Sequence, residues 1–178
     1  MGHLWARGYE ATSVQALVRR MGINRGSLYD TFGDKRALFL AALRRYDEQS
    51  RCARLQGLEQ NPSPTGAIEA LFSGWIDTAL TDPDRSGCFL TNTALELAVH
   101  DREIGGLVAR GQQETEAFFL GLVKKGQAAG EIAAVLDAPR AARALLAALI
   151  DVLVLARSRP EPALLESIAH DAVASLRP

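Results

Sequence analysis

Apolar residues recur along most of the chain at the i, i+3, i+4, i+7 spacing of amphipathic helices. The clearest stripes occupy residues 68–80, 104–123 and 164–176. Residues 138–157 are instead apolar around most of the helical circumference, as expected of a helix that is buried on more than one side. Because the periodicity is helical and not alternating, the pattern predicts an all-α protein.

Glycine and proline mark the ends of the predicted helices. These breaks fall at Gly22, Gly33 and the segments 61–64, 81–87, 130–139 and 158–162. None of these breaks falls between Gly33 and residue 61. We therefore expect a linking helix there, from Asp34 to about Arg54.

The segment from Thr12 to Phe39 has the pattern of two short helices and the start of a third. Thr12 is expected to cap the first helix, with Gln15 completing a capping box. Gly22 supplies the turn that ends it. The predicted inward face of this helix consists of Val14, Leu17, Val18 and Met21.

Asn24 is a favourable N-cap for the second helix. Leu28 and Phe32 are four residues apart and face the core together with Ile23. A helix, a short turn containing glycine, and a second short helix with a small, polar outward face are typical of a helix-turn-helix. The second helix is therefore the predicted recognition helix.

The outward residues of this second helix suit contact with DNA bases. Gly26 and Ser27 are small, so the helix can enter a major groove about 12 Å wide without obstruction. Arg25 can donate two hydrogen bonds to guanine, and Asp30 can accept one from the amino group of cytosine. Thr31 belongs to the same outward face.

Contacts to DNA phosphates are expected from four further positions. These are Thr12 or Ser13 at the start of the first helix, Tyr29, and Lys35 in the first turn of the linking helix. The alternative for Tyr29 is a packed aromatic, and the alternative for Lys35 is a solvated lysine.

The charge distribution agrees with a nucleic-acid partner for the N-terminal part. The chain of 178 residues has a formal net charge of −1. Residues 1–54 contain ten Arg or Lys and five Asp or Glu, a charge of +5, whereas residues 55–178 carry −6. A basic head on an acidic body favours a polyanionic partner, although a small basic segment also arises by chance or neutralises its own neighbour.

The residues from Arg7 to Phe39 also carry a family resemblance. RGYEATSV, followed by LVRRMGINRGSLYDTFGDKRALF, resembles the DNA-binding domain of TetR/AcrR-type transcriptional repressors, with a match from Leu4 to about Leu43. The resemblance implies a helix-turn-helix domain over residues 1–43. It also implies a helical domain over residues 44–178 that binds a small inducer and forms a homodimer.

The resemblance also assigns roles within the head. Residues 24–31 correspond to the recognition helix, Tyr29 to a phosphate-contacting aromatic and Lys35 to a backbone-contacting lysine. The implied function is that of a repressor that an unidentified small molecule releases from a double-stranded operator. Binding of that molecule would shift the linking helix and change the spacing of the two DNA-binding heads.

The helix at the N-terminus, before the helix-turn-helix, departs from the family pattern, because family members have a longer helix there. The sequence starts at MGHLWARGY and retains only Leu4 and Trp5 of the apolar face that packs on the recognition helix. About a dozen residues are missing by comparison. Exposed apolar surface costs about 25 cal/mol per Å², so the DNA-binding head is expected to be loosened.

The segment from Ser86 to Ile104 resembles a ligand-domain variant in a branch of the family that includes electrophile- and metal-responsive repressors. A mostly apolar pocket with a few polar groups is expected in this domain. Its candidate lining residues are Phe72, Trp75, Cys88, Thr91, Asn92, Leu95, Phe118 and Phe119. The alternative is an ordinary helical core.

Two positions in this region suggest further chemistry. Cys88, near the start of a helix, is either a reactive thiol or an inert buried one. Glu96 and His100 lie four apart on one helical face, but two ligands do not make a metal site, so a structural or salt-bridging role is favoured. No metal and no cofactor are predicted.

Dimerisation is predicted from the two apolar helices at residues 138–157 and 163–176. Two copies of this pair would form a four-helix bundle around a two-fold axis, and the operator would be a pseudo-palindrome. The expected interface is Leu145, Leu149, Val152, Leu153, Ala156, Leu165, Ile168, Ala172 and Val173. The alternative is that these side chains are buried within one chain.

Other classes of protein are disfavoured. The sequence has three histidines and none of the common catalytic or nucleotide-binding fingerprints, so we do not expect an enzyme. Neither a signal peptide nor a membrane span is predicted, and with two distant cysteines this favours the cytoplasm. The remaining alternative is a helical protein-interaction module that does not bind DNA.

Overall fold

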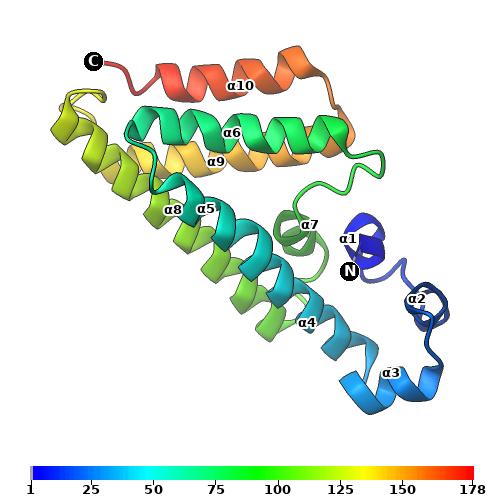
Figure 1. Ribbon diagram of the computed structural model, residues 1–178. Coiled ribbons are helices and arrows are strands. Elements are labelled where there is room, and N and C mark those ends of the chain that lie inside the picture. Colours follow the sequence, from blue (N-terminus) through cyan, green and yellow to red (C-terminus); the bar gives the residue numbers. More distant parts are fainter. Residues whose placement is uncertain (1) are drawn as a thin grey trace.

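The computed structural model describes residues 2–178, with side chains from Leu4 onward, and every regular element in that range is a helix (Figure 1). The prediction of an all-α fold is therefore confirmed. The helices are α1 (Gly2–Arg7), α2 (Val14–Met21), α3 (Arg25–Phe32), α4 (Lys35–Tyr46), α5 (Ala53–Leu58), α6 (Pro64–Thr81), α7 (Phe89–Glu96), α8 (Arg102–Ala129), α9 (Ala138–Ser158) and α10 (Pro162–Ala174). None of the helices in this range is long and apolar enough to cross a membrane.

Helix α2 begins one residue later than the sequence pattern predicts. Ser13 is its N-cap, and its hydroxyl accepts a hydrogen bond from the Ala16 amide at 3.1 Å. Thr12, the expected cap, is fully buried, and its hydroxyl donates to the Gly8 carbonyl at 2.7 Å. The capping prediction was wrong because Ser13 is an equally good cap and Thr12 is used to close the preceding turn.

The turn between α2 and α3 has the predicted chemistry. Gly22 ends α2 in the left-handed conformation, with φ of 66°, where a side chain would be strained. Asn24 caps α3, its side chain accepting from the Ser27 amide at 2.8 Å. Leu28 is fully buried, whereas Met21 is 42% exposed and does not join the predicted inward face. As the last residue of α2, Met21 lies at the edge of the small core.

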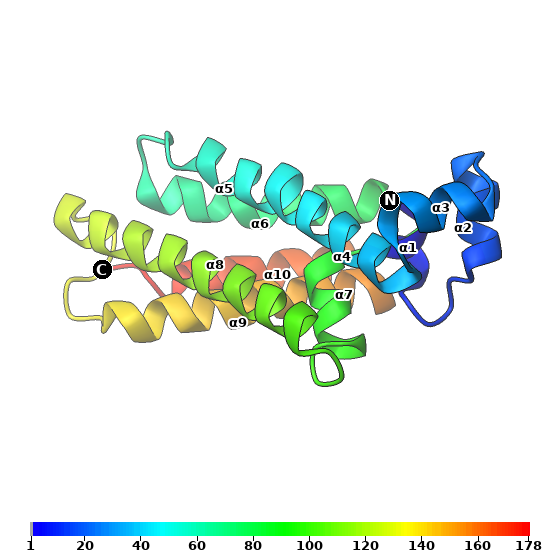
Figure 2. The same cartoon turned by 90° about the horizontal axis from the view of Figure 1, so that it is seen from below.

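The linking helix is longer than predicted and is not uniform. Helix α4 continues through a π-helical segment, Asp47–Cys52, directly into α5, so the rod ends at Leu58 instead of near Arg54 (Figures 1 and 2). A π-turn accommodates an extra residue per turn and is frequent at functional sites. Here it rotates Arg51 into the protein, where the side chain is buried.

The C-terminal body is built around α9. This helix contacts α8, α6 and α10, which explains why apolar residues surround most of its circumference (Figures 1 and 2). Phe72 of α6 stacks on Phe119 of α8 with ring centroids 6.3 Å apart. Both rings belong to the main hydrophobic core.

The predicted dimer-interface side chains instead form this core. Seven of them are buried within a single chain: Leu145, Leu149, Val152, Leu153, Ala156, Leu165 and Val173. Ile168 and Ala172 are half-buried and pack against them. The seven buried side chains therefore follow the alternative of burial within one chain, because apolar periodicity does not distinguish an intramolecular partner helix from an intermolecular one, whereas Ile168 and Ala172 stay a prediction.

A close approach at the start of α8 yields a prediction. A Cβ atom at Gly105 would lie 2.4 Å from the Ala98 carbonyl oxygen, which is backbone and cannot rotate away. Gly105→Ala is expected to lower the free energy of unfolding by about 1–3 kcal/mol, measured by urea denaturation.

The neighbouring Gly106 supplies the control. The nearest atom to a Cβ at that position is 3.7 Å away, at the end of Arg110. Gly106→Ala should therefore raise the unfolding free energy by up to about 1 kcal/mol through helix propensity. Equal effects of the two substitutions would contradict this packing.

Candidate DNA-binding surface and ligand cavity

The candidate base-contacting residues lie together on the exposed side of α3, at the end of the molecule away from α10 (Figure 1). The side chains exposed there are Arg25, Ser27, Tyr29, Asp30 and Thr31, together with the backbone of Gly26. Tyr29 is 45% exposed, so the alternative of a packed aromatic does not hold. This face combines hydrogen-bond donors and acceptors with little steric bulk at its N-terminal end.

The candidate phosphate contacts flank this face unequally. Ser13 is exposed at the start of α2. Lys35 is half-buried, with its Nζ 4.1 Å from the centroid of the Tyr9 ring, a cation–π contact that positions the ammonium group. Thr12 cannot contact a phosphate because it has no exposed surface, and that assignment is withdrawn.

An ion-pair cluster joins the helix-turn-helix to the body. Arg36 of α4 donates to both carboxylate oxygens of Asp101, at 2.5 and 2.9 Å, and to Glu103 at 3.0 Å. Arg44, two turns further along α4, also reaches Glu103 at 2.8 Å. Asp101 is at the same time the N-cap of α8. Its hydrogen bonds with Arg36 lower the pKa of Asp101 from 3.8 to about 2.

The turn after α1 is held by Glu96. This carboxylate accepts from the backbone amides of Tyr9 and Glu10 at 3.0 and 2.8 Å. Gly8 has φ of 82°, and a Cβ there would lie 2.6 Å from the Glu96 carboxylate. Glu96 thus has the structural role favoured over metal binding, although its partners are backbone groups and not a basic side chain.

The short first helix is anchored on the body as well. Leu4 is buried, and the Trp5 indole donates to the Gly87 carbonyl at 2.8 Å. The Trp5 ring meets the Tyr46 ring edge-on at 4.8 Å. These long-range contacts had no local signal in the sequence, because each joins residues more than 40 positions apart.

A partly open cavity of about 50 Å³ lies between α5 and helices α6 to α9. Of the predicted ligand-binding residues, Trp75, Cys88 and Thr91 line it. Phe118 instead lines an adjoining open groove of about 370 Å³ between α5 and α8. The structure therefore brings together only part of the predicted pocket.

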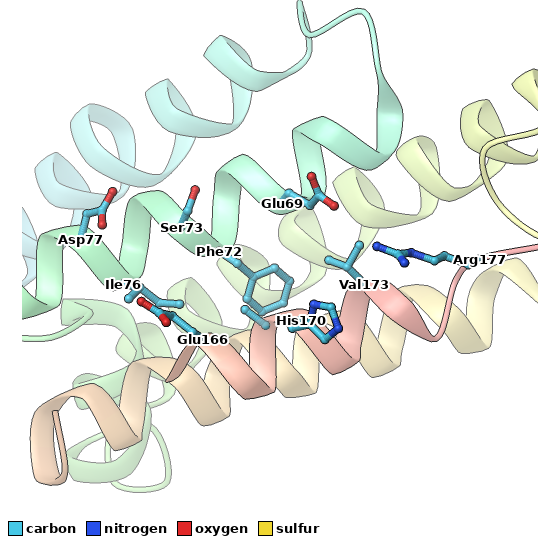
Figure 3. Close-up of a pocket in the computed structure, with 10 residues that line it drawn as sticks. Glu69, Phe72, Ser73, Ile76, Asp77, Glu166, His170, Val173 and Arg177 are labelled. Carbon is cyan, nitrogen blue, oxygen red and sulfur yellow. The ribbon is translucent and has the colours of Figure 1, made fainter. Parts of the chain in front are cut away.

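The remaining predicted residues lie elsewhere. Phe72 borders a groove of about 240 Å³ between α6 and α10, beside His170 (Figure 3). Phe119 is a core residue, and the Asn92 amide donates to the Ser86 carbonyl at 2.7 Å. Leu95 is 76% exposed and faces away from the body, so its assignment to the pocket was wrong.

Sequence reasoning missed Arg51 and Arg54, which reach the cavity from the linking helix. Arg51 forms ion pairs with Asp47, at 2.5 Å, and with Glu114, and it also donates to the Cys52 thiol at 3.2 Å. Asp47, Cys52 and Glu114 therefore surround a guanidinium group. Burial raises the pKa of the Cys52 thiol. The only signal for these arginines was their place in the linking helix.

Residues 3–42 match the family described as bacterial regulatory proteins, tetR family, and residues 64–171 match the tetracyclin repressor-like C-terminal domain. The chain belongs to the TetR family. The segment between the two matches contains the C-terminal part of α4, the π-turn and α5.

Two curated relatives align over 129 residues. YezE, an HTH-type transcriptional regulator of Bacillus subtilis, is 40% identical over 70% of this chain and 66% of its own length. ComR, an HTH-type transcriptional repressor of Escherichia coli, is 29% identical over 72% of this chain and 61% of its own length. The alignment thus spans less than two thirds of either relative.

Solved structures of TetR-family proteins share the whole fold. A cysteine mutant of CifR, solved in complex with 26-bp double-strand operator DNA, is 27% identical with a TM-score of 0.84, covering 97% of this chain and 90% of its own. A TetR regulator from Chloroflexus aurantiacus is 26% identical with a TM-score of 0.84, covering 96% and 86%. Reduced NemR from E. coli, at 18% identity, covers 98% of this chain and 91% of its own and shows the same fold with a TM-score of 0.85.

Cys88 lies where α4 and the start of α7 meet in this TetR-family chain. It immediately precedes α7 and is buried, and it accepts a hydrogen bond from the Tyr46 hydroxyl at 3.5 Å. Burial raises the pKa of Tyr46 well above its ordinary value, so this hydroxyl remains a donor. Cys88 is therefore a packed thiol at the wall of the cavity.

The Arg36–Asp101 pair predicts a specific dependence of stability on pH. The pKa of the Asp101 carboxyl is lower in the folded than in the unfolded chain, so its contribution to stability is complete above about pH 4 and is lost toward about pH 2. Asp101→Asn keeps a capping oxygen for α8 but removes the charge. The difference in Tm between wild type and variant should be constant near neutral pH and shrink as the pH falls through this window.

Combining Asp101→Asn with Arg36→Met distinguishes the contribution of the ion pair to stability from that of the helix cap. In an Arg36→Met background, Asp101→Asn should change Tm less near neutral pH, and the difference should vary less with pH. A Tm difference that is the same at about pH 6 and about pH 2.5 would contradict the assigned role of the pair.

Proposed function

We propose that this chain is a transcriptional repressor that binds a pseudo-palindromic DNA operator as a homodimer and is released by a small molecule. The exposed face of α3 carries the proposal, since Arg25, Asp30 and Thr31 lie there beside small residues at the N-terminal end of the helix. A helix of this kind fits the major groove, and its side chains match the hydrogen-bonding groups of base edges.

The relatives support this proposal. The CifR structure that shares this fold was solved with operator DNA, and ComR is named as a repressor. The chain's own charge agrees, because its basic residues are in excess in the first 54 positions. Phosphate contacts from Ser13, Tyr29 and Lys35 would fix the register of α3 on the duplex.

The dimer requires a surface other than the predicted one, because those side chains fill the core. The outward face of α9 presents the small or apolar residues Ala144, Ala147 and Val154, with the exposed Asp151 between them, next to the exposed face of α10. Small residues allow two helices to approach closely, so a second copy of α9 and α10 would complete a four-helix bundle. We assign the interface to this outward face.

Release from DNA follows from the path of the linking helix. Helix α4 begins beside α3 and is tied to α8 by Arg36 and Arg44, and the same rod continues to Arg51 and Arg54 at the cavity. A ligand that shifts this rod would change the separation of two heads in a dimer. It must bind the released arrangement more tightly than the DNA-competent one.

Arg25 gives the sharpest test of base recognition. Arg25→Ala should weaken binding to the operator by about 1–3 kcal/mol and relax specificity at a single base pair in each half-site. Fluorescence anisotropy on the duplex upstream of the chain's own gene, and on base-substituted duplexes, measures both effects. Arg140→Ala, the same charge change at the exposed start of α9, should bind as the wild type does.

Equal effects of Arg25→Ala and Arg140→Ala on specific binding would count against the proposal. It would also count against the proposal if no operator-sized duplex obtained by selection bound the wild type. The latter outcome would favour a helical protein-interaction module.

The interface assignment is tested by a charge on α9. Ala147→Glu places a carboxylate in the middle of the outward face and should convert the dimer to a monomer, because an unpaired buried charge is strongly unfavourable. Light scattering after size-exclusion chromatography should give twice the chain mass of 19.2 kDa for the wild type. Ala134→Glu, at an exposed position between α8 and α9, should remain dimeric, and a dimeric Ala147→Glu would overturn the assignment.

A further inference from the structure

Within the described part of the chain, the cavity between α5 and helices α6 to α9 is lined by basic but not by acidic side chains. Its walls are largely apolar, with Leu71 and Trp75 of α6, Leu90 of α7, and Leu149 and Leu153 of α9. The polar groups are two guanidinium groups and the side chains of Thr91, Gln112 and Thr115. No Asp or Glu is among the described residues that line it.

Only one of the two guanidinium groups is neutralised. Arg51 pairs with Asp47 and Glu114; Glu114 lines the open groove, and neither carboxylate is among the residues that line the cavity. Its positive charge is therefore balanced by carboxylates outside the cavity. These ion pairs also make Arg51 part of the wall between the cavity and the groove, since it lines both.

Arg54 is held in place without a carboxylate. Its guanidinium lies 4.5 Å from the centroid of the Trp75 ring, and Nη2 is 3.4 Å from the Thr78 hydroxyl. Among the described residues, no carboxylate lies within ion-pair distance of Arg54. A half-buried cation over an aromatic ring, at the rim of an apolar cavity, favours a negatively charged partner.

Gly74 creates the space for this arrangement. A Cβ at position 74 would lie 2.7 Å from Arg54 Nη1, so the guanidinium rests against α6 only because residue 74 has no side chain. Gly74, Trp75 and Thr78 together fix the position of the guanidinium, and of these three residues Trp75 lines the cavity. A group that is already positioned loses less conformational entropy when it binds a ligand.

We propose that the cavity binds a compact organic anion, whose carboxylate pairs with Arg54 while its apolar part packs between Trp75 and the leucines of α9. The identification of this ligand as the inducer rests on the proposed function, whereas the binding of an anion does not. The cavity of about 50 Å³ holds several times the space of one water molecule, so larger acids must displace side chains. A neutral or cationic ligand would leave the charge of Arg54 unpaired.

The test compares acids with uncharged molecules of the same shape. The probes are butyrate and benzoate, with butyramide and benzamide as their neutral counterparts, and dissociation constants are measured by ligand-observed NMR titration of the full chain near neutral pH. For the wild type, an acid is expected to bind at least about tenfold more tightly than its amide, as for a charge-assisted hydrogen bond.

Three variants test whether Arg54 causes the preference for acids over their amides. Arg54→Met should abolish it while keeping most of the apolar volume. Gly74→Ala should reduce it by displacing the guanidinium, and because this substitution favours the helix, Tm should not fall. Arg140→Met, with a change of charge far from the cavity, should retain the full preference.

The inference is overturned if neither acid binds more tightly than its amide, or if Arg54→Met retains the preference. Anisotropy on operator DNA without any probe separates this result from the proposed function. Intact operator binding with no acid preference rejects the anion site alone. If the wild type prefers acids and Arg54→Met loses this preference, but the wild type binds no operator, the proposed function alone is rejected.

Discussion

The ion pair between Arg36 and Asp101 joins the two parts of the molecule on which function depends. Arg36 lies in the first turn of the linking helix, directly after the helix-turn-helix, and Asp101 caps the longest helix of the body. The bidentate contact thus connects the start of α8 to the helix that follows α3. Glu103 extends the same contact to Arg44, so α4 and the start of α8 are connected at two points along the rod.

The remaining contacts between the head and the body are also made between residues far apart in the sequence. They consist of hydrogen bonds around a small cluster of aromatic rings. Glu96 binds the turn after α1, and Trp5 reaches Gly87. Phe39 meets both Tyr9 and Phe89 edge-on, at 5.2 and 5.1 Å. The head is held at several points, and a ligand in the cavity would act on it through the rod that carries Arg51 and Arg54.

Local features of the sequence predicted the helix-turn-helix well. Asn24, Gly22 and Leu28 act through neighbours within a few positions, so their roles follow from caps, turns and helical spacing. Non-local features were not accessible in this way: apolar spacing showed that α9 is buried but not that its partners belong to the same chain. Leu95 failed for the same reason, because its exposure depends on how distant elements pack, whereas Thr12 failed because the neighbouring Ser13 is the cap of α2. The position of the Arg54 guanidinium against Gly74 depends on contacts between α5 and α6, and no sequence motif predicts these contacts.

The central claim is that the face of α3 binds duplex DNA through phosphate and base contacts. The most direct measurement is the affinity for the upstream duplex at several salt concentrations. Each phosphate contact releases counterions, so the logarithm of the association constant should fall linearly with that of the salt concentration, by about 0.9 per contact, and specific binding should persist against competitor DNA. Affinity that is independent of salt, or that competitor DNA removes entirely, would contradict the claim.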